Sequence, residues 1–439
     1  MQRLDKGAWG NWIEKGWSMD QVVISDHDRT ILRDLAKQFR DLCERPIEQE
    51  KIKLWIDHND LKETRPLILV DMENGWNEAL RFDRDIKCEG YMAQDWEMWL
   101  RKEIMYGTKI KDDKPLTPVF YLPHRGINTE WGITEDHEGS GDINQAYSWK
   151  PKFADLEDEE FEELDVEKAI EDPYIRVDWE TTNAYVNLAK EVFEGILDVQ
   201  LRTWWFWSSH MVLAYSHMRG LDGMMIDFYE YPEKVHEIFQ KLTTGYIKKL
   251  KQIESEGVLY NNVGNTFVGS GGLGWSSQLH PDPNNVKLKD IWGLCEAQEA
   301  TGISPWLYKE FIFPYFKQVS ELFGLTCYAC CEGVDPYWED IKQLHNMRRV
   351  SVSQWADARK MSEYLGKDYV YSYKARSTDV ACENMDEDHI HKTMADFLDM
   401  TKNKNNIEIV LKDLHTIGNK PEQVFRWTEI VREEINKRY

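Results

Sequence analysis

Short apolar runs recur along the chain, each bounded by polar or turn-forming residues. Such runs are typical of buried strands in a parallel sheet, whose two faces are both covered. Amphipathic helical stretches separate most of them, and this alternation predicts a parallel α/β fold. Eight runs favour a closed (β/α)8 TIM barrel over an open sheet. The predicted strands lie at residues 65–76, 115–123, 199–207, 257–264, 324–332, 348–357, 368–375 and 406–415.

The helical pattern is clearest in two stretches. In "DHDRTILRDLAKQFRDLC", apolar residues recur every three or four positions from Ile31 to Leu42, which predicts an amphipathic helix. A second helix is predicted for "YPEKVHEIFQKLTTGYIKKLKQIESEG", with Pro232 near its start and Gly257 just past its end. We therefore expect an N-terminal helical extension at 1–65 and the barrel at 66–439.

Two segments interrupt the alternation, and we interpret both as insertions at the carboxyl ends of strands. Residues 123–180 include the acidic run "ADLEDEEFEELDVEKAIED", which is typical of a solvated insertion. Residues 265–285, "NTFVGSGGLGWSSQLHPDPNN", form a long glycine-rich loop. Barrel enzymes place mobile lids at this position, so we expect a cover for the active site.

Charge and composition limit the classes of partner. A formal net charge of −24 argues against nucleic acids and anionic membranes, because both need a basic face. No window approaches the roughly 18 apolar residues of a membrane span, and the start "MQRLDKGAWGNWIEKGW" lacks the apolar core of a secretory signal. We therefore expect a cytoplasmic protein. Its seven cysteines are better explained as free thiols or metal ligands than as a disulfide framework.

A thiol, a carboxylate and an imidazole follow two of the predicted strands. Because the side chains of a strand alternate faces, Cys330 and Glu332 are expected to point to one side and Cys331 to the other. With His415 after the last strand, they offer three ligands of the types zinc accepts, and a catalytic zinc keeps one open position. Buried cysteines are also common packing residues, which is the alternative interpretation.

Further candidates lie near other strand ends, where a barrel builds its active site, and in the segment just before a predicted helix start. Glu296 and Gln298 in "WGLCEAQEATGISPW" could hold a substrate or protonate a leaving group, or could serve only as hydrogen-bonding residues of a loop. Ser304 is a predicted N-cap and Pro305 the first helical residue. The candidate substrate-binding residues are Glu73, Trp207, His210, Asn262 and Lys374.

From about residue 195 to the end, the order of several motifs resembles the uroporphyrinogen decarboxylase superfamily of barrels. The motifs are "RGLDGMMIDFYEYPEKVHEIFQKL", "SPWLYKEFIFPYFKQVSELFG", the cysteine-rich strand and "KDLHTIGNKPEQVFRW". True decarboxylases of this superfamily carry an "RQAGR"-like segment that this chain lacks. Its methyltransferases carry a His-x-Cys zinc motif and a third cysteine on the final strand. Here the first motif reads "YACCEG" and His415 lies near the final position, so Cys331 is an alternative to Cys330.

The resemblance implies a zinc-dependent methyltransferase. The expected reaction moves a methyl group from a small methylated substrate, such as an aryl methyl ether, to cobalamin carried by a separate corrinoid protein. Two alternatives remain open. One is a metal-independent decarboxylase of the same fold, gripping carboxylates with Arg125, Arg202 and Lys374. The other is a noncatalytic barrel that binds an aromatic compound or a sugar on tryptophan-rich walls. A homodimer is compatible with each.

Overall fold

The computed structural model describes residues 19–132, 137–139, 147–202, 208–328 and 330–439. The chain divides into two compact units, each described by itself. Unit 1 comprises Met1–Ile127, Arg176–Thr203 and Lys374–Tyr439, and unit 2 comprises Asn128–Ile175 and Trp204–Tyr373.

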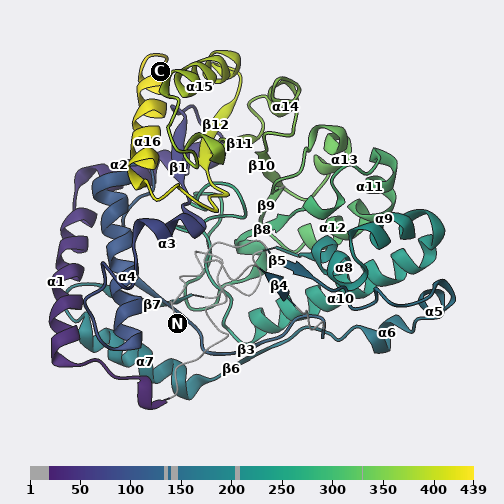
Figure 1. The fold of residues 1–439 in the computed structure, drawn as a ribbon, viewed down its shortest axis with the longest axis horizontal. Helices are drawn as coiled ribbons and strands as arrows, with labels where there is room; N and C mark the ends of the chain where they lie inside the picture. Colours follow the sequence, from purple (N-terminus) through teal and green to yellow (C-terminus); the bar gives the residue numbers. More distant parts are fainter. Residues whose placement is uncertain (1–18, 133–136, 140–146, 203–207, 329) are drawn as a thin grey trace. The chain divides into compact units, whose positions relative to one another are not determined.

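The first long helix of unit 1 follows its apolar pattern. In α1 (Asp26–Cys43), Leu32, Leu35 and Phe39 are buried, and the Ser25 side chain caps the start by accepting the Asp28 N–H. Phe39 meets the ring of Trp99 edge to face, and α1 packs along α4 (Figure 1). The other helices of unit 1 are η1 (Met19–Gln21), α2 (Pro46–Asn59), η2 (Glu73–Gly75), α3 (Trp76–Ala79), α4 (Tyr91–Met105), η3 (Tyr106–Ile110), α7 (Trp179–Val192), η7 (Ser377–Asp379), α15 (Glu387–Thr401) and α16 (Pro421–Asn436).

Unit 1 holds two pairs of parallel strands. β1 (Leu67–Val70) pairs with β12 (Asn406–Leu411), and β2 (Val119–Pro123) pairs with β7 (Asp198–Arg202). The residues of β1 and β12 are all buried, as their continuous apolar runs predict. Two short strands, β3 (Gly126–Asn128) and β6 (Ile175–Val177), stand at the sequence boundaries of the units.

The buried carboxylate of Asp113 holds the start of β1 in place. Asp113 accepts two hydrogen bonds from the Arg65 guanidinium, one from Arg432 and one from the Ile68 N–H, at 2.7–2.9 Å. Burial alone would raise the pKa of Asp113, but the two guanidinium groups hold it below its ordinary value. One carboxylate therefore joins strand β1 to helix α16.

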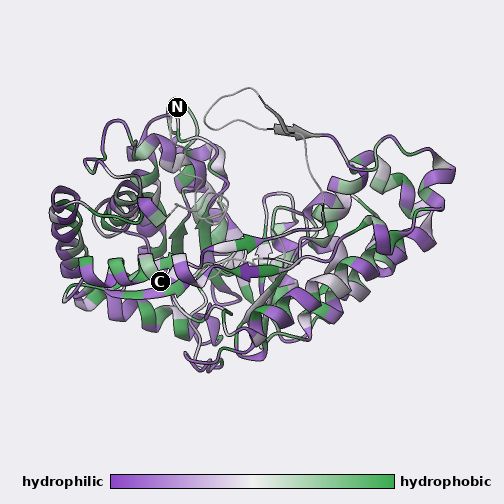
Figure 2. Cartoon of the chain, turned by 90° about the horizontal axis from the view of Figure 1, so that it is seen from below, coloured by the Kyte–Doolittle hydropathy of each residue, from purple (hydrophilic) through white to green (hydrophobic). Residues whose placement is uncertain are grey.

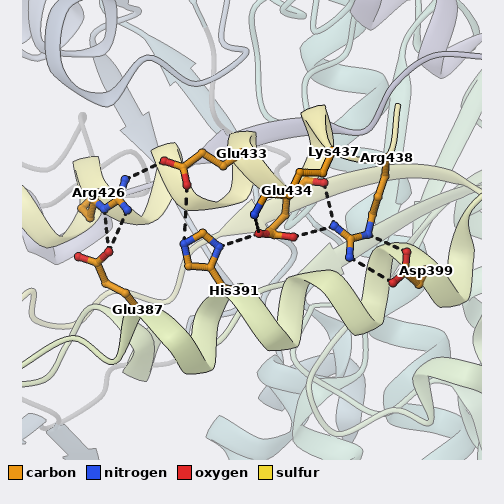
Figure 3. Close-up of polar contacts among 8 residues, drawn as sticks. All are labelled: Glu387, His391, Asp399, Arg426, Glu433, Glu434, Lys437 and Arg438. Atoms are coloured by element: carbon orange, nitrogen blue, oxygen red, sulfur yellow. Dashed lines mark hydrogen bonds and ion pairs between the residues drawn. The ribbon is translucent and has the colours of Figure 1, made fainter.

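A network of charged side chains joins α15 to α16 (Figure 3). Arg426 pairs with Glu387, and Arg438 pairs with Asp399. His391 lies between them and contacts Glu434 through Nδ1 at 2.7 Å. Each of these pairs has at least one partly or fully exposed partner, so each adds little by itself, and the network chiefly fixes how the two helices align.

Unit 2 contains the longer run of parallel strands. β8 (Trp292–Cys295), β9 (Leu325–Tyr328), β10 (Met347–Val352) and β11 (Val370–Lys374) pair in that order. Trp292, Leu294, Leu325 and Cys327 form a buried core cluster with Val268 and Leu279. In Figure 2 the helices carry both hydrophobic and hydrophilic residues, as amphipathic helices do.

The helices of unit 2 confirm several predicted start and stop signals. Pro232 opens α10 (Pro232–Ser255), and Gly257 follows its end with a φ of +69°. Ser304 caps α11 (Pro305–Phe311) by accepting the Leu307 N–H. The remaining helices of unit 2 are α5 (Asp158–Glu162), α6 (Val166–Ala169), α8 (Met211–Arg219), α9 (Leu221–Glu230), η4 (Leu288–Asp290), η5 (Gln298–Ala300), α12 (Phe313–Ser320), η6 (Asp335–Tyr337), α13 (Trp338–Ile341) and α14 (Ala358–Leu365), and β4 (His137–Gly139) pairs with β5 (Tyr147–Trp149).

Seven of the eight predicted strands are confirmed, and the one at 257–264 is wrong. The Asn262 side chain explains the difference. Its amide accepts the Trp292 N–H and donates to the Trp292 C=O, at 2.9 and 2.8 Å, in place of a backbone ladder. Trp292 instead begins β8, which the pattern did not predict.

The closed barrel is not confirmed. The structure is mixed α/β with a parallel sheet of six strands, and this sheet does not close among the described residues. The predicted division at residue 65 stays a prediction, and residues 19–65 are part of unit 1.

The acidic segment within residues 123–180 is not only a solvated insertion, because its side chains contact helix α10. It forms α5 and α6, and Glu167 and Asp172 each lie 2.8 Å from the ammonium of Lys241 on α10. Lys248 adds a second contact to Asp172. Lysines of a neighbouring helix therefore offset part of the charge of this segment. None of the described helices combines the length and apolar character that a bilayer crossing needs.

Candidate active site

The register of β8 and β9 brings two chain segments to one edge of unit 2. Because Cys295 pairs with Tyr328 at the carboxyl ends of these parallel strands, the residues that follow each strand lie next to each other. Glu296 follows β8, and Cys330 to Glu332 follow β9. Ligands of parallel α/β sheets bind at this edge.

Glu296 is a deeply buried acid of this edge. It is 1% exposed, and its Oε1 accepts a hydrogen bond of 2.9 Å from the Ser208 hydroxyl. Burial raises its pKa well above the ordinary value, and the neighbouring Glu299 and Glu332 raise it further. Burial therefore favours the protonated form of Glu296, which is the form that can donate a proton.

Glu332 ties the two strand ends together. One carboxylate oxygen accepts the Ala297 N–H, and the other accepts the Cys330 N–H, both at 2.9 Å. Burial raises the pKa of Glu332, and these backbone hydrogen bonds act in the opposite direction. β9 ends at Tyr328, so Glu332 lies in the segment after the strand.

His210 and Glu299 complete the polar surroundings of Glu296. His210 has a left-handed backbone with a φ of +46°, and its N–H donates to the Ser208 hydroxyl oxygen at 3.2 Å. Burial lowers the pKa of His210 to about 4, so its ring is neutral at pH 7. Burial also raises the pKa of Glu299, which lies three residues after Glu296 in the sequence. A strained, non-glycine residue beside buried acids is typical of a functional site.

The glycine-rich loop covers Cys330. Residues 268–274 are all buried, and the Ser270 hydroxyl lies 3.0 Å from the Cys330 sulfur. Gly274 is required by close packing, since a Cβ there would stand 2.0 Å from the Asn262 carbonyl oxygen. The loop is thus a packed part of this edge, and its opening as a lid stays a prediction.

Unit 1 has its own polar group at the carboxyl ends of β1 and β12. Lys412 pairs with Glu73 at 2.9 Å, and Glu73 and Asp413 both have left-handed backbones. Asp71 is 2% exposed, and its Oδ1 accepts the Glu73 N–H at 3.3 Å. Burial, and then the charge of Glu73, raise the pKa of Asp71 to about 6.

We expect Asp71→Asn to stabilise the protein at neutral pH but not in acid. The folded pKa of Asp71 is raised above its unfolded value, so its protonated form favours folding below about pH 4, and that contribution is lost as the pH rises through about 6. The variant should gain about 1–3 kcal/mol in free energy of unfolding at pH 7.5 and nothing at pH 4. Urea unfolding at several pH values measures this, and an equal gain at both pH values would contradict it. The exposed Asp34→Asn is the matched control, with no pH-dependent difference expected.

The predicted site residues divide between the two units. Unit 2 brings together Glu296, Cys330 and Glu332 with His210, and Gln298 starts η5 beside them. Asn262 also belongs to unit 2, where its amide is bonded to Trp292. Glu73, Lys374 and His415 belong to unit 1. Trp207 lies outside the described residues.

No family model matches the chain, and no curated protein matches it. Among solved structures, the chain is similar to a methyltransferase from Methanosarcina mazei. The similarity covers 73% of this chain and 80% of that chain, with a TM-score of 0.40 and 10% sequence identity. Values this low carry no argument about function. The function proposed below therefore rests on the residues themselves and on the motifs of the sequence.

The zinc prediction can be compared with the donors that unit 2 provides. Cys330 and Glu332 are ligand types that zinc accepts, but both oxygens of Glu332 already accept backbone hydrogen bonds. Among the described residues, no group of three or more His, Cys, Asp or Glu side chains is arranged to hold a metal ion. These donors do not make a zinc site by themselves. Zinc stays a prediction, and no step proposed below passes through a metal.

The face assignment of the cysteines is wrong. Because β9 ends at Tyr328, the alternation of a strand does not apply, and the sulfur atoms of Cys330 and Cys331 lie 3.7 Å apart. The sequence analysis also missed Ser208 and Glu299. Glu299 could have been found, since it lies three residues from Glu296 in the same polar run, whereas no local pattern indicates that Ser208 contacts a residue 88 positions away.

Proposed function

We propose that this chain is a methyltransferase that removes the methyl group of a small methylated substrate, of the aryl methyl ether class, for transfer to the cobalamin of a separate corrinoid protein. The motifs shared with the uroporphyrinogen decarboxylase superfamily support this class of reaction. The observation that carries the proposal is the buried Glu296 at the carboxyl edge of β8, hydrogen-bonded to Ser208 and flanked by Glu299 and Glu332.

The chemistry requires an acid at the leaving oxygen. When the partner is bound, its corrinoid supplies the nucleophile for the methyl carbon. The carbon–oxygen bond breaks and leaves its electron pair on oxygen. Glu296 donates its proton to that oxygen, so that a neutral phenol leaves instead of a phenolate. A positioned general acid of this kind contributes roughly 10²–10⁴-fold in rate.

The neighbouring groups hold Glu296 ready for this step. Ser208 fixes one carboxyl oxygen, and the same hydroxyl accepts the His210 N–H, so the acid and the start of α8 are positioned together. The neutral His210 ring adds no positive charge that would remove the proton from Glu296. Glu332 holds the loop after β9 against Ala297, directly after the acid. These residues orient the acid and exclude water from it.

Turnover should need a corrinoid. We expect the purified chain with 2-methoxyphenol and enzymatically reduced corrinoid protein to release catechol in amounts equal to the methylated corrinoid seen in the visible spectrum. The chain without corrinoid should release none. Metal analysis of the same preparation tests the zinc prediction separately, since Cys330→Ala and His415→Ala should each lose bound zinc if both residues are ligands.

Two results would replace the proposal. Release of carbon dioxide from a carboxylated substrate without any corrinoid would indicate the decarboxylase. Saturable binding of aromatic compounds or sugars, with no turnover across a panel of methyl ethers and corrinoids, would indicate the noncatalytic protein.

A further inference from the structure

Two consecutive thiols lie in contact at the edge of unit 2. The sulfur atoms of Cys330 and Cys331 are 3.7 Å apart, and all seven cysteines are outside disulfide bonds. Cys330 is 8% exposed, whereas Cys331 is half-buried and reachable from solvent. A sulfur–sulfur bond is about 2.05 Å long. The two sulfur atoms must therefore approach each other by about 1.7 Å to form a disulfide bond.

We propose that Cys330 and Cys331 are a redox pair that a small-molecule disulfide converts to a vicinal disulfide, which detaches Cys330 from the glycine-rich loop. The redox chemistry is independent of the proposed function, and its effect on methyl transfer rests on that function. The pair would add regulation by cellular thiols to the site of Glu296.

The steps balance with a disulfide R–S–S–R as oxidant. The half-buried Cys331 thiolate, which solvent reaches, attacks one sulfur, forms a mixed disulfide and releases the first R–S⁻. The Cys330 thiolate then attacks the Cys331 sulfur, forms the vicinal bond and releases the second R–S⁻. The two protons of the cysteine thiols pass to the two released thiolates. The protein loses two electrons and two protons, and R–S–S–R becomes two R–SH.

The product would be easily reduced again. Consecutive Cα atoms are about 3.8 Å apart, below the usual 4.4–6.8 Å between the Cα atoms of a disulfide. Such strained bonds have more oxidising potentials and belong to the labile, regulatory class. A vicinal pair therefore suits reversible control better than permanent cross-linking.

The contacts of Cys330 show what oxidation would change. Its sulfur lies 3.0 Å from the Ser270 hydroxyl of the glycine-rich loop, and its N–H donates to Glu332. A bond to Cys331 draws the sulfur away from Ser270 and moves the residue that Glu332 holds. Glu332 in turn holds Ala297, the neighbour of Glu296. Oxidation of Cys330 would therefore affect the position of Glu296 through the two hydrogen bonds that Glu332 accepts, from the Cys330 N–H and the Ala297 N–H.

The other cysteines of this region do not compete. Cys327 is fully buried on β9, and Cys295 is fully buried on β8. Burial raises the pKa of the Cys295 thiol far above its ordinary value, so it does not form the reactive thiolate. Of the thiols on these two strands and the loop after β9, Cys331 is the one a small disulfide meets first.

The test follows mass and thiol alkylation in the full chain. The native protein is treated with oxidised glutathione, denatured, alkylated with iodoacetamide and digested with trypsin. We expect the peptide 318–342 to be two hydrogens lighter, with its single alkyl group on Cys327, and dithiothreitol to restore three alkyl groups. A disulfide between Cys327 and Cys330, stable glutathione on the wild-type peptide, or three alkylated cysteines would each overturn the pair.

Cysteine variants test whether the disulfide forms, and activity measurements test whether it lowers demethylation. Cys330→Ser should retain glutathione on Cys331, and Cys331→Ser should form no disulfide, whereas the matched Cys382→Ser in unit 1 should behave as wild type. Phenylarsine oxide, which binds paired thiols, should bind native but not oxidised wild type, a readout that needs no variant to fold. Oxidation should lower demethylation at least tenfold and reversibly, but not in Cys331→Ser. Unchanged demethylation by the oxidised protein would overturn the switch. Absence of demethylation in the reduced protein would instead contradict the proposed function and leave the mass result standing.

Discussion

Glu296→Gln is expected to lower kcat for demethylation by roughly 10²–10⁴-fold while changing KM little. Glutamine keeps the size of the side chain and an oxygen that can accept a hydrogen bond from the Ser208 hydroxyl. Its amide has no acidic proton to transfer to the leaving oxygen. The wild-type rate should fall as the pH rises through the raised pKa of Glu296. The variant should lose that part of the pH profile.

A surface variant of unit 2 controls for general effects of the substitution. Glu310 lies on α11 with a side chain 52% exposed, and Glu310→Gln should keep the wild-type kcat. Circular dichroism and thermal unfolding check that Glu296→Gln is folded. A folded Glu296→Gln protein with wild-type kcat and an unchanged pH profile would remove Glu296 from the reaction.

Asp113→Ala should cause a large loss of stability. The change leaves the Arg65 and Arg432 guanidinium groups together without their anion, and it removes the acceptor of the Ile68 N–H. Breaking a buried pair in this way costs about 3–5 kcal/mol in free energy of unfolding. Urea unfolding at pH 7 measures it as a lower midpoint.

The pH dependence of this loss has a definite sign. The folded pKa of Asp113 is depressed, so its contribution is present above the ordinary value of 3.8 and is lost as the pH falls through the folded pKa. Asp83→Ala is the matched control, because Asp83 pairs with Arg81 at an exposed position of the same unit and should change the midpoint little. Equal midpoint shifts in the two variants would contradict the role given to Asp113.

The sequence predicted most of the strands and misplaced one whose partner is a side chain. The run of β12, NIEIVL, is mostly apolar, and its six residues are all buried. β8, WGLC, was not predicted, and its glycine fits against the Phe323 ring. The run at 257–264 was as apolar as a strand, but Asn262 took the hydrogen bonds that a strand would have made.

The candidate site was predicted in part for a similar reason. The position after a predicted strand indicated Glu332, whereas Glu296 follows β8, a strand that the pattern did not predict. The roles of Glu332 and Cys330 could not be predicted, because they depend on where β9 ends and on the backbone N–H groups that bond to Glu332 beyond it. Periodicity describes which face a side chain occupies while the strand lasts, and it does not indicate where the strand ends.

The contact between Asn262 and Trp292 also bears on self-association. Among the described strands, β9 is the strand neighbour of β8, and the Ile291 carbonyl faces β9 by accepting the Gly324 N–H. The Trp292 N–H and C=O point the other way, where an unpaired strand invites another molecule to add to the sheet. The Asn262 amide occupies both groups, so at Trp292 this edge of β8 offers neither backbone group to the strand of another molecule.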